Sequence, residues 1–123
     1  MTAIELNTYL HGAGAKNHEC IEACVACLVA CEMCSDACLA EPDNAMLVTC
    51  IRLDRDCAEV CSAAVRMMAR GGPLTAIMCG ACADACDACA AECEKHAAHH
   101  EHCRICADAC RKCADACRKM VAA

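Results

Sequence analysis

Small apolar residues and charged residues alternate along this 123-residue chain with the period of an α-helix. Cysteine occupies every third or fourth position in the stretches 20–38, 79–93 and 103–117, and mostly alanine or charged residues fill the positions between. Residues spaced alternately three and four apart lie on one face of a helix and form the heptad seam by which helices pack together. The pattern therefore predicts helices whose inward faces are lined with thiol groups.

Turn-forming residues divide this pattern into four long helices. The segment Glu41-Pro42-Asp43-Asn44 ends the first helix, because proline disfavours helical geometry in the residue before it, and Gly71-Gly72-Pro73 ends the second and starts the third. We expect the side chains of Asn17 and Asn44 to cap the first two helices. A short turn at about residues 97–101 precedes the last helix. The predicted helices span about residues 17–39, 45–70, 73–96 and 101–119.

Short connections between long helices imply that consecutive helices run antiparallel. We therefore predict an all-α fold, an antiparallel up-down-up-down four-helix bundle that forms one domain over residues 17–123. Residues 1–16 form a separate N-terminal segment, in which the pattern over residues 2–9 allows a short amphipathic helix.

The composition is unusual for a domain of this size. The chain has 19 cysteines, one tyrosine, and neither tryptophan nor phenylalanine, so an ordinary apolar core is undersupplied. Small domains with insufficient cores usually depend on disulfides or metals. The net charge of −6 argues against a nucleic-acid partner. No continuous run approaches the ~18 apolar residues of a membrane span, so no membrane partner is expected.

The start of the chain bears on the compartment. Residues 1–14 have no basic region followed by a sustained apolar run, and no pair of arginines, so a secretory signal is not expected. We therefore predict a cytoplasmic protein. Thiols are kept reduced in the cytosol, where a cysteine-rich pattern indicates metal binding more than a disulfide framework.

The cysteines form eight C-x-x-x-C pairs. The Cβ atoms of residues i and i+4 on a helix lie roughly 5–6 Å apart, whereas a disulfide needs Cβ atoms ~3.8 Å apart. These pairs are therefore better placed to hold a metal ion between two sulfurs than to oxidise. They are Cys20/Cys24, Cys27/Cys31, Cys34/Cys38, Cys57/Cys61, Cys82/Cys86, Cys89/Cys93, Cys106/Cys110 and Cys113/Cys117.

Among soft metals, Cu(I) suits this pattern best. Structural zinc usually takes C-x-x-C units from turns, whereas units such as Cys86/Cys89 lie within a predicted helix, and four thiolates on Zn(II) leave a charge of about −2 that is costly to bury. The ferredoxin run C-x2-C-x2-C-x3-C-P is absent. Cu(I) accepts thiolate and thioether ligands, and one ion per thiolate keeps the core close to neutral. Ag(I) would satisfy the same argument.

The second predicted helix carries fewer cysteines and other polar or soft side chains. We expect Asp54 to be partly exposed or paired with a nearby arginine, since charged groups are seldom fully buried. We expect Met67 and Met68 to fill gaps in the core, with thioether ligation of metal as the alternative.

A cluster of histidines lies where the third helix ends and the fourth begins: His96, His99, His100 and His102. Continuing the cysteine seam of the third helix places His96 and His100 on its inward face, with Met46 nearby at the start of the second helix. Imidazole and thioether groups are suitable relay ligands for a metal that enters the bundle at this end. The alternative is a solvent-exposed polar turn.

These cysteine-rich helices resemble the cytosolic copper storage proteins. The resemblance rests on the segment ECIEACVACLVACEMCSDAC, on LDRDCAEVC and on two CxxCxxxCxxC helices, and it covers about residues 17–119. It implies a homotetramer that binds many Cu(I) ions along each bundle core and catalyses no reaction. Exported relatives carry signal peptides, so the cytosolic branch is the match. The candidate Cu(I) ligands are then Cys20, Cys24, Cys27, Cys31, Cys34, Cys38, Cys50, Cys57, Cys61, Cys79, Cys82, Cys86, Cys89, Cys93, Cys103, Cys106, Cys110, Cys113 and Cys117.

The predicted function is storage of many Cu(I) ions per chain. The alternative is a metallothionein-like buffer or detoxification protein for zinc or cadmium. An enzyme is not expected, because no βαβ pattern surrounds any C-x-x-C unit and no nucleophile–base pair stands out. The expected partners are copper ions and a protein that donates or accepts copper.

Overall fold

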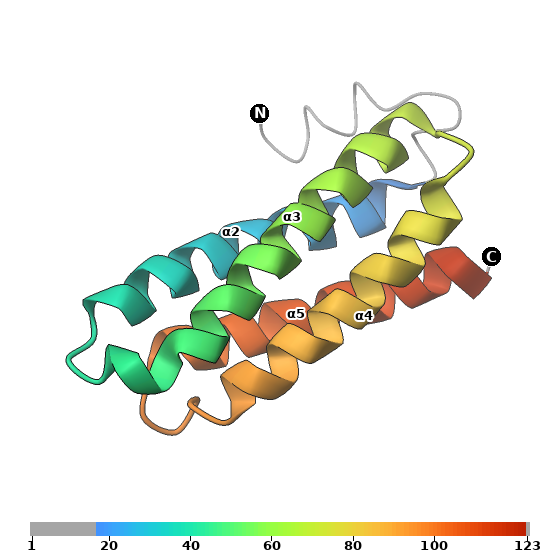
Figure 1. Cartoon of the computed structure of the whole chain (residues 1–123). Helices are drawn as coiled ribbons and strands as arrows, with labels where there is room; N and C mark the ends of the chain where they lie inside the picture. The colour runs from blue at the N-terminus through green and yellow to red at the C-terminus, as the bar shows by residue number, and fades with distance from the viewer. Residues whose placement is uncertain (1–16, 123) are drawn as a thin grey trace.

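The computed structural model describes residues 17–122, which form four long α-helices and one short 3₁₀ helix (Figure 1). The short helix allowed over residues 2–9 lies outside the described residues. The elements are α2 (His18–Ala40), η2 (Asn44–Leu47), α3 (Val48–Arg70), α4 (Thr75–Glu94) and α5 (Glu101–Ala122).

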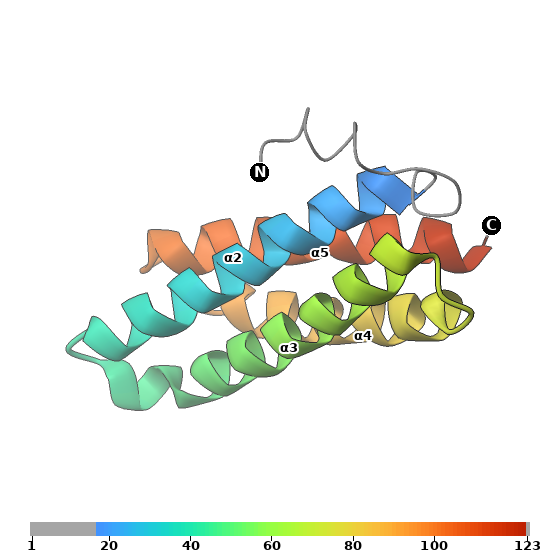
Figure 2. The ribbon, with the colours of Figure 1, turned by 90° about the horizontal axis from the view of Figure 1, so that it is seen from above.

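The helices form an antiparallel up-down-up-down bundle, which confirms the predicted fold class (Figures 1 and 2). Helix α2 packs against α3 and α5, and α4 packs against the same two helices, so the order in the chain is also the order around the bundle. One end contains η2 and the turn of residues 95–100, and we call it the histidine end. The opposite end contains the turn of residues 71–74 with Met68, Met78 and Met120, and we call it the methionine end.

The two predicted asparagine caps are wrong. Neither Asn17 nor Asn44 makes a side-chain capping bond to the helix that follows. The Nδ2 of Asn17 instead donates to the carbonyl oxygen of Met68 at 2.9 Å, and that of Asn44 donates to the carbonyl oxygen of Leu39 at 3.1 Å. Both carbonyls belong to the last turn of a helix, where intrahelical donors run out. Each amide therefore ties one helix end to another segment, and α3 begins only at Val48, after η2.

The predicted stop after the second helix is confirmed. Gly71 adopts a left-handed conformation with φ 62°. Its N–H donates to the carbonyl oxygen of Met68 at 3.1 Å, and the N–H of Gly72 donates to that of Met67 at 3.0 Å, which is the Schellman pattern. Helix α4 then begins at Thr75, slightly later than predicted, and ends at Glu94, two residues before the predicted end at 96.

This turn allows a matched test of backbone strain. Gly71→Ala is expected to destabilise the metal-free protein by about 1 kcal/mol, because an L-residue is strained at positive φ. Gly72→Ala is the control, since its φ is not positive and its Cβ would meet only the Met67 carbonyl oxygen at 3.7 Å. Urea denaturation under reducing conditions measures both. Equal midpoints for the two variants would contradict the strain.

Helix α2 is apolar over much of its length. Among the described residues it is the one helix long and apolar enough, by length and composition, to cross a membrane. The expectation concerned an unbroken apolar run, and α2 contains none of that length, because Glu22, Glu32 and Asp36 interrupt it. The core helix of a bundle passes the same criterion, and all six α2 cysteines are buried against the other helices.

Candidate metal-binding core

The interior of the bundle is built from thiol groups. All nineteen cysteines are buried, with at most 3% of any of them exposed. Helix α2 supplies six, α3 three, and α4 and α5 five each, as the spacing of three and four requires for a single inward stripe on each helix. Alanines such as Ala83, Ala90, Ala107 and Ala114 flank these stripes and are also buried. Ordinary large apolar residues contribute little to this core.

The sulfurs of the C-x-x-x-C pairs lie side by side within each helix. Five of the eight pairs have Sγ–Sγ distances of 3.9–4.0 Å, and they belong to all four long helices. No disulfide is present, and all nineteen cysteines are free thiols. The geometry agrees with the prediction that this spacing keeps the pairs reduced.

Sulfurs from different helices approach one another even more closely. The Sγ atoms of Cys24 and Cys113 are 3.4 Å apart, and those of Cys50 and Cys93 are 3.5 Å apart. Cys27 of α2 lies within 3.6–3.9 Å of sulfurs from each of the other three long helices. The thiols therefore form a continuous column of contacting sulfur atoms along the bundle axis.

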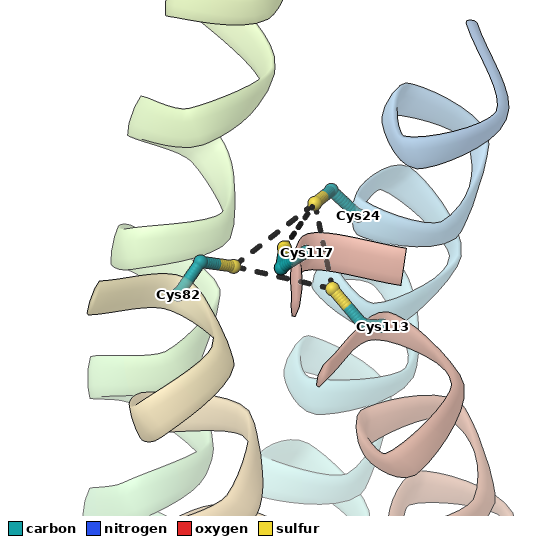
Figure 3. A group of neighbouring side chains, drawn as sticks. All are labelled: Cys24, Cys82, Cys113 and Cys117. Atoms are coloured by element: carbon teal, nitrogen blue, oxygen red, sulfur yellow. Dashed lines mark hydrogen bonds between the residues drawn. The ribbon is translucent and has the colours of Figure 1, made fainter. Parts of the chain in front are cut away.

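Groups of four sulfurs within this column are compact enough to hold metal ions. Five such groups have all their sulfurs within 4.8 Å of one another, and four further groups of three or more possible ligands meet the same limit. Figure 3 shows one group, in which Cys24 from α2, Cys82 from α4, and Cys113 and Cys117 from α5 point toward a common centre. Several cysteines, including Cys27, Cys31, Cys110 and Cys113, belong to more than one group. Neighbouring groups therefore share ligands, as in a cluster of bridged ions.

The distances suit ions that bridge pairs of sulfurs. Metal–thiolate bonds are ~2.3 Å long for zinc, so an ion in line between two sulfurs holds them roughly 4.6 Å apart. The observed pairs at 3.9–4.0 Å need to open by only a fraction of an ångström, or can bind with a bent geometry.

Burial keeps one thiol at each end of the core, Cys79 and Cys103, protonated in the absence of metal. Loss of hydration raises the pKa of Cys79 to about 12, and it does the same for Cys103. At neutral pH a cation therefore binds these sulfurs by displacing their protons. A monovalent ion that replaces one proton per thiol leaves the charge of the core unchanged.

Asp54 is fully buried among the thiols, and the expectation that it is partly exposed or paired with an arginine is wrong. Its Oδ1 accepts hydrogen bonds from the thiols of Cys89 at 3.1 Å, Cys106 at 3.3 Å and Cys93 at 3.6 Å. Its Oδ2 lies 3.9 Å from the sulfur of Cys50. Burial, followed by the nearby Cys106 and Cys50, raises the pKa of this carboxyl to about 8. The carboxyl is therefore mostly protonated at neutral pH in the metal-free protein.

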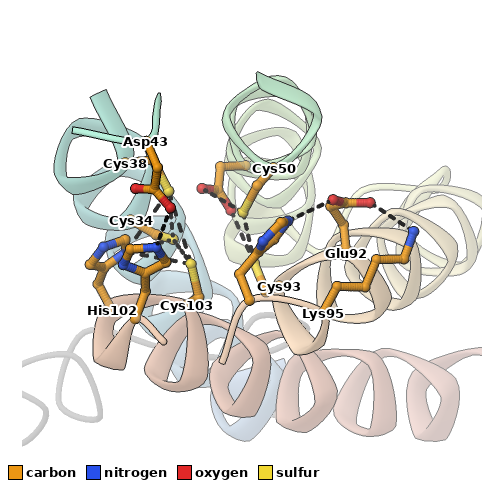
Figure 4. A network of polar contacts seen from close by, with 12 residues as sticks. Cys34, Cys38, Asp43, Cys50, Glu92, Cys93, Lys95, His102 and Cys103 are labelled. Carbon is orange, nitrogen blue, oxygen red and sulfur yellow. Dashed lines mark hydrogen bonds and ion pairs between the residues drawn. The ribbon is translucent and has the colours of Figure 1, made fainter. Parts of the chain in front are cut away.

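A histidine closes the core at the histidine end, and it is not one of the two that the sequence singled out. The Nδ1 atom of His102 lies 3.6 Å from the sulfurs of Cys34 and Cys103 and 3.8 Å from that of Cys38. Its Nε2 lies 3.2 Å from Oε1 of Glu41 at the surface. Figure 4 shows His102 beside these three cysteines. The ring therefore connects the outermost thiols with the exterior.

The residues predicted to take up metal lie around this histidine or outside it. Nε2 of His96 lies 3.0 Å from Oε2 of Glu92. His100 lies near Glu41 and Asp43, and its ring stacks on that of His102 with the centroids 5.2 Å apart. Met46 is exposed. The inward stripe of α4 does not extend to residues 96 and 100 as predicted, because the helix ends at Glu94 and its helical spacing ends there.

The model of one protein family, described as copper storage protein, matches residues 13–122. The chain belongs to the copper storage protein family. The predicted resemblance is therefore confirmed over nearly the whole length of the chain.

Solved structures of the family share this fold. The copper storage protein of Streptomyces lividans, loaded with 10 copper equivalents, is 45% identical, covers 98% of each chain and has a TM-score of 0.87. Apo copper storage protein 3 of Bacillus subtilis is 47% identical over 84% of this chain and 96% of its own, with a TM-score of 0.77. A curated relative, the cysteine-rich protein YhjQ of Bacillus subtilis, is 48% identical over 65 residues, which are 53% of this chain and 60% of YhjQ.

The contacts of Asp54 and His102 with the thiols were not predicted from the sequence. For Asp54 the signal was present: it lies four residues after Cys50 and three before Cys57, so it occupies a position of the inward stripe of α3. For His102 no comparable signal exists, because it lies beside the α5 stripe and not on it. Only the start of α5 at Glu101 and the proximity of α2 bring its ring to the cysteines.

Proposed function

We propose that this protein stores Cu(I) and that its nineteen cysteines are the ligands. The observation that carries the proposal is the row of overlapping four-sulfur groups, all buried, along the bundle axis. Membership of the copper storage protein family supports it, as does the Cu(I)-bound structure of a relative 48% identical to this chain. Copper is here the stored cargo, and many ions are bound per chain.

The charge of the core favours Cu(I) over a divalent ion. Four thiolates around each Zn(II) or Cd(II) leave about −2 per site in a nonaqueous interior, which is costly. One Cu(I) per thiolate leaves no net charge. A metallothionein-like buffer of divalent ions therefore fits this core less well. Since the family role is storage, we infer a function in sequestration and not in catalysis.

The setting of the protein is inferred from its relatives and its surface. The Streptomyces lividans relative is a cytosolic copper storage protein, and we place this chain in the cytosol by analogy. We propose a homotetramer, as the family resemblance implies, and the outer face of α2 offers a surface for it, since Val25, Val29 and Met33 are exposed one turn apart. A copper donor or acceptor protein would then meet the assembly at an accessible bundle end.

An anaerobic titration of the reduced protein with Cu(I) tests the storage function. The expected result is a plateau near one Cu(I) per cysteine, or 19 per chain, in protein recovered by gel filtration. A plateau near half this ratio would mean that each Cu(I) takes two thiolates and that neighbouring sites share none. A plateau at a few ions would show that most of the cysteines only pack the core, and it would remove the proposal.

We also propose that the histidine end takes up copper, with His102 as the inner relay ligand and His96, His100 and Met46 outside it. His102→Ala is expected to slow loading from a Cu(I) donor roughly tenfold, which is the effect of losing ~1.4 kcal/mol of interaction in the transfer step. Stopped-flow absorbance of copper–thiolate bands measures the rate. His99→Ala is the matched control, since His99 is exposed on the same turn. The final capacity should fall by no more than about one ion.

Three outcomes distinguish the role of His102 in copper uptake from the roles of His96 and His100. Slower loading only in His102→Ala assigns the relay to that residue alone. Slower loading also in the His96→Ala/His100→Ala double variant extends the relay outward to the surface. Unchanged rates in both would mean that copper does not pass the histidines, and the uptake proposal would fall.

A further inference from the structure

A pocket opens at the methionine end, at the opposite end of the bundle from His96, His100 and His102. Its volume is about 200 Å³, and it is lined by Glu19, Cys20, Ala116, Lys119 and Met120. Glu19 and Lys119 are exposed and lie across the rim, with Nζ 3.9 Å from Oε1. Cys20 is 3% exposed, so the pocket reaches the outermost thiol of α2. A small molecule in this pocket can approach the sulfur core from outside.

Cys20 leads directly into the core. Its sulfur lies 3.7 Å from that of Cys117, which lies 3.7 Å from that of Cys24. Cys24 in turn contacts Cys113 at 3.4 Å and belongs to the four-sulfur group of Figure 3. An ion can therefore move from the interior to Cys20 by exchanging one sulfur ligand at a time.

The two ends of the bundle offer different ligands to copper. At the histidine end, imidazoles and carboxylates surround the opening. At the methionine end, Met120 lines the pocket, Met68 is fully buried, and Met78 packs against the core. Thioethers are soft, neutral ligands that hold Cu(I) without retaining it as strongly as thiolates do. The methionine end therefore resembles a site of transfer to another soft ligand.

The charges also differ between the ends. Toward the methionine end, α3 carries Arg66 and Arg70, and α5 carries Arg118, which pairs with Asp87, and Lys119, which pairs with Glu19. The acidic residues around the opposite opening are Glu41, Asp43 and Glu92. Local fields of this kind steer charged ligands toward the end of opposite sign. Cations are thus drawn to the histidine end, and an anion meets less repulsion at the methionine end.

We propose that the pocket formed by Cys20, Ala116 and Met120 is a second port, at which an anionic low-molecular-weight thiol withdraws Cu(I) from Cys20 and Cys117. This inference rests on the storage function proposed above, and it separates the site of withdrawal from the site of uptake. Lys119 at the rim can pair with the anion in place of Glu19, and Ala116 leaves the space that its thiol group occupies.

The exchange balances without any change of oxidation state. The incoming thiol sulfur bonds to the Cu(I) held by Cys20 and Cys117, and its proton passes to the Cys20 sulfur as the Cys20–copper bond breaks. A second molecule of the external thiol then repeats the step at Cys117, and copper leaves bound to two external thiolates. Both protein sulfurs end as thiols.

Withdrawal kinetics with three thiols of similar size test the port. Protein loaded anaerobically with Cu(I) is mixed with 3-mercaptopropionate, 2-mercaptoethanol or cysteamine, and a chromogenic Cu(I) chelator in fixed excess traps the released ion. The thiol-dependent part of the rate is compared between variants. Ala116→Leu fills the pocket, and Lys119→Glu reverses the charge at its rim. Ala109→Leu and Lys112→Glu are matched controls, because each lies seven residues earlier on the same face of α5.

In the wild-type protein the anionic thiol should act fastest and the cationic thiol slowest. Ala116→Leu should slow withdrawal by all three thiols roughly tenfold or more, because the ligand no longer fits. Lys119→Glu should slow the anionic thiol about fivefold and leave the neutral thiol unchanged. The controls, and the rate of loading from a Cu(I) donor in every variant, should match the wild type.

The outcomes distinguish this inference from the storage function. If the protein does not load with copper, storage itself fails before withdrawal is measured. If loaded Ala116→Leu and Lys119→Glu proteins release copper at the wild-type rate while His102→Ala slows release, copper leaves through the histidine end and the second port is wrong. Lys119→Glu changes only an exposed side chain, so this test stands even where leucine at position 116 impairs folding.

Discussion

Loading the core with Cu(I) is expected to stabilise the bundle more than any single substitution destabilises it. In the metal-free protein, weak contacts between thiols take the place of a packed apolar core. Each bound ion would replace such contacts by bonds that join helices, as in the group formed by Cys24 of α2, Cys82 of α4, and Cys113 and Cys117 of α5. A ligand that binds only the folded state at a hundred times its Kd adds about 2.7 kcal/mol per site. A few such sites match the whole ~5–15 kcal/mol that stabilises an ordinary domain.

Thermal unfolding of anaerobic samples with increasing numbers of Cu(I) per chain measures this effect. The Tm should rise with each addition, by tens of degrees in total, until the plateau of the titration. Cys27→Ala should reduce the gain more than Cys79→Ala, because Cys27 belongs to two four-sulfur groups whereas Cys79 lies at the methionine end of α4. A Tm that does not respond to copper would show that the ions bind at the surface and do not link the helices.

The sequence was sufficient for the helices and for the thiol core. A spacing of three and four over nearly twenty residues leaves only one face on which the cysteines of α2 can lie, and the same holds for α4 and α5. The bundle follows, because four such faces bury one another only when the helices are adjacent. The Gly71 stop was predictable for a local reason, since glycine adopts positive φ without strain.

The errors involve choices that depend on neighbours distant in sequence. An asparagine amide can cap its own helix or bind a carbonyl elsewhere, and only the packing of α2 against the end of α3 places the Met68 carbonyl beside Asn17. His102 likewise reaches cysteines of α2 that lie more than sixty residues away. For Asp54 the helical spacing predicts a buried side chain, whereas the cost of burying a carboxylate predicts an exposed one. The structure agrees with the spacing, because the surrounding thiols supply hydrogen bonds to the buried carboxyl.

Replacing Asp54 by asparagine is expected to remove most of the pH dependence of stability in the metal-free protein between pH 4 and 8. The pKa of this carboxyl rises from 3.8 to about 8 on folding, with burial as the largest cause. Between these values the folded state binds a proton that the unfolded state has lost, so stability falls as the pH rises. A difference of about four pKa units corresponds to a loss of order 5 kcal/mol across this range. Asparagine is close in shape, remains neutral, and can still accept the hydrogen bonds from Cys89 and Cys106.

Urea denaturation under reducing conditions at pH 5, 6.5 and 8 measures this dependence. The wild-type protein should lose several kcal/mol from the lowest to the highest pH, whereas Asp54→Asn should change little and be the more stable of the two at pH 8. Asp56→Asn is the matched control, since Asp56 is exposed two residues further along α3 and its replacement should leave the wild-type slope intact. If Asp54→Asn keeps the slope of the wild type, the carboxyl is ionised in the folded core and the thiols around it hold its charge.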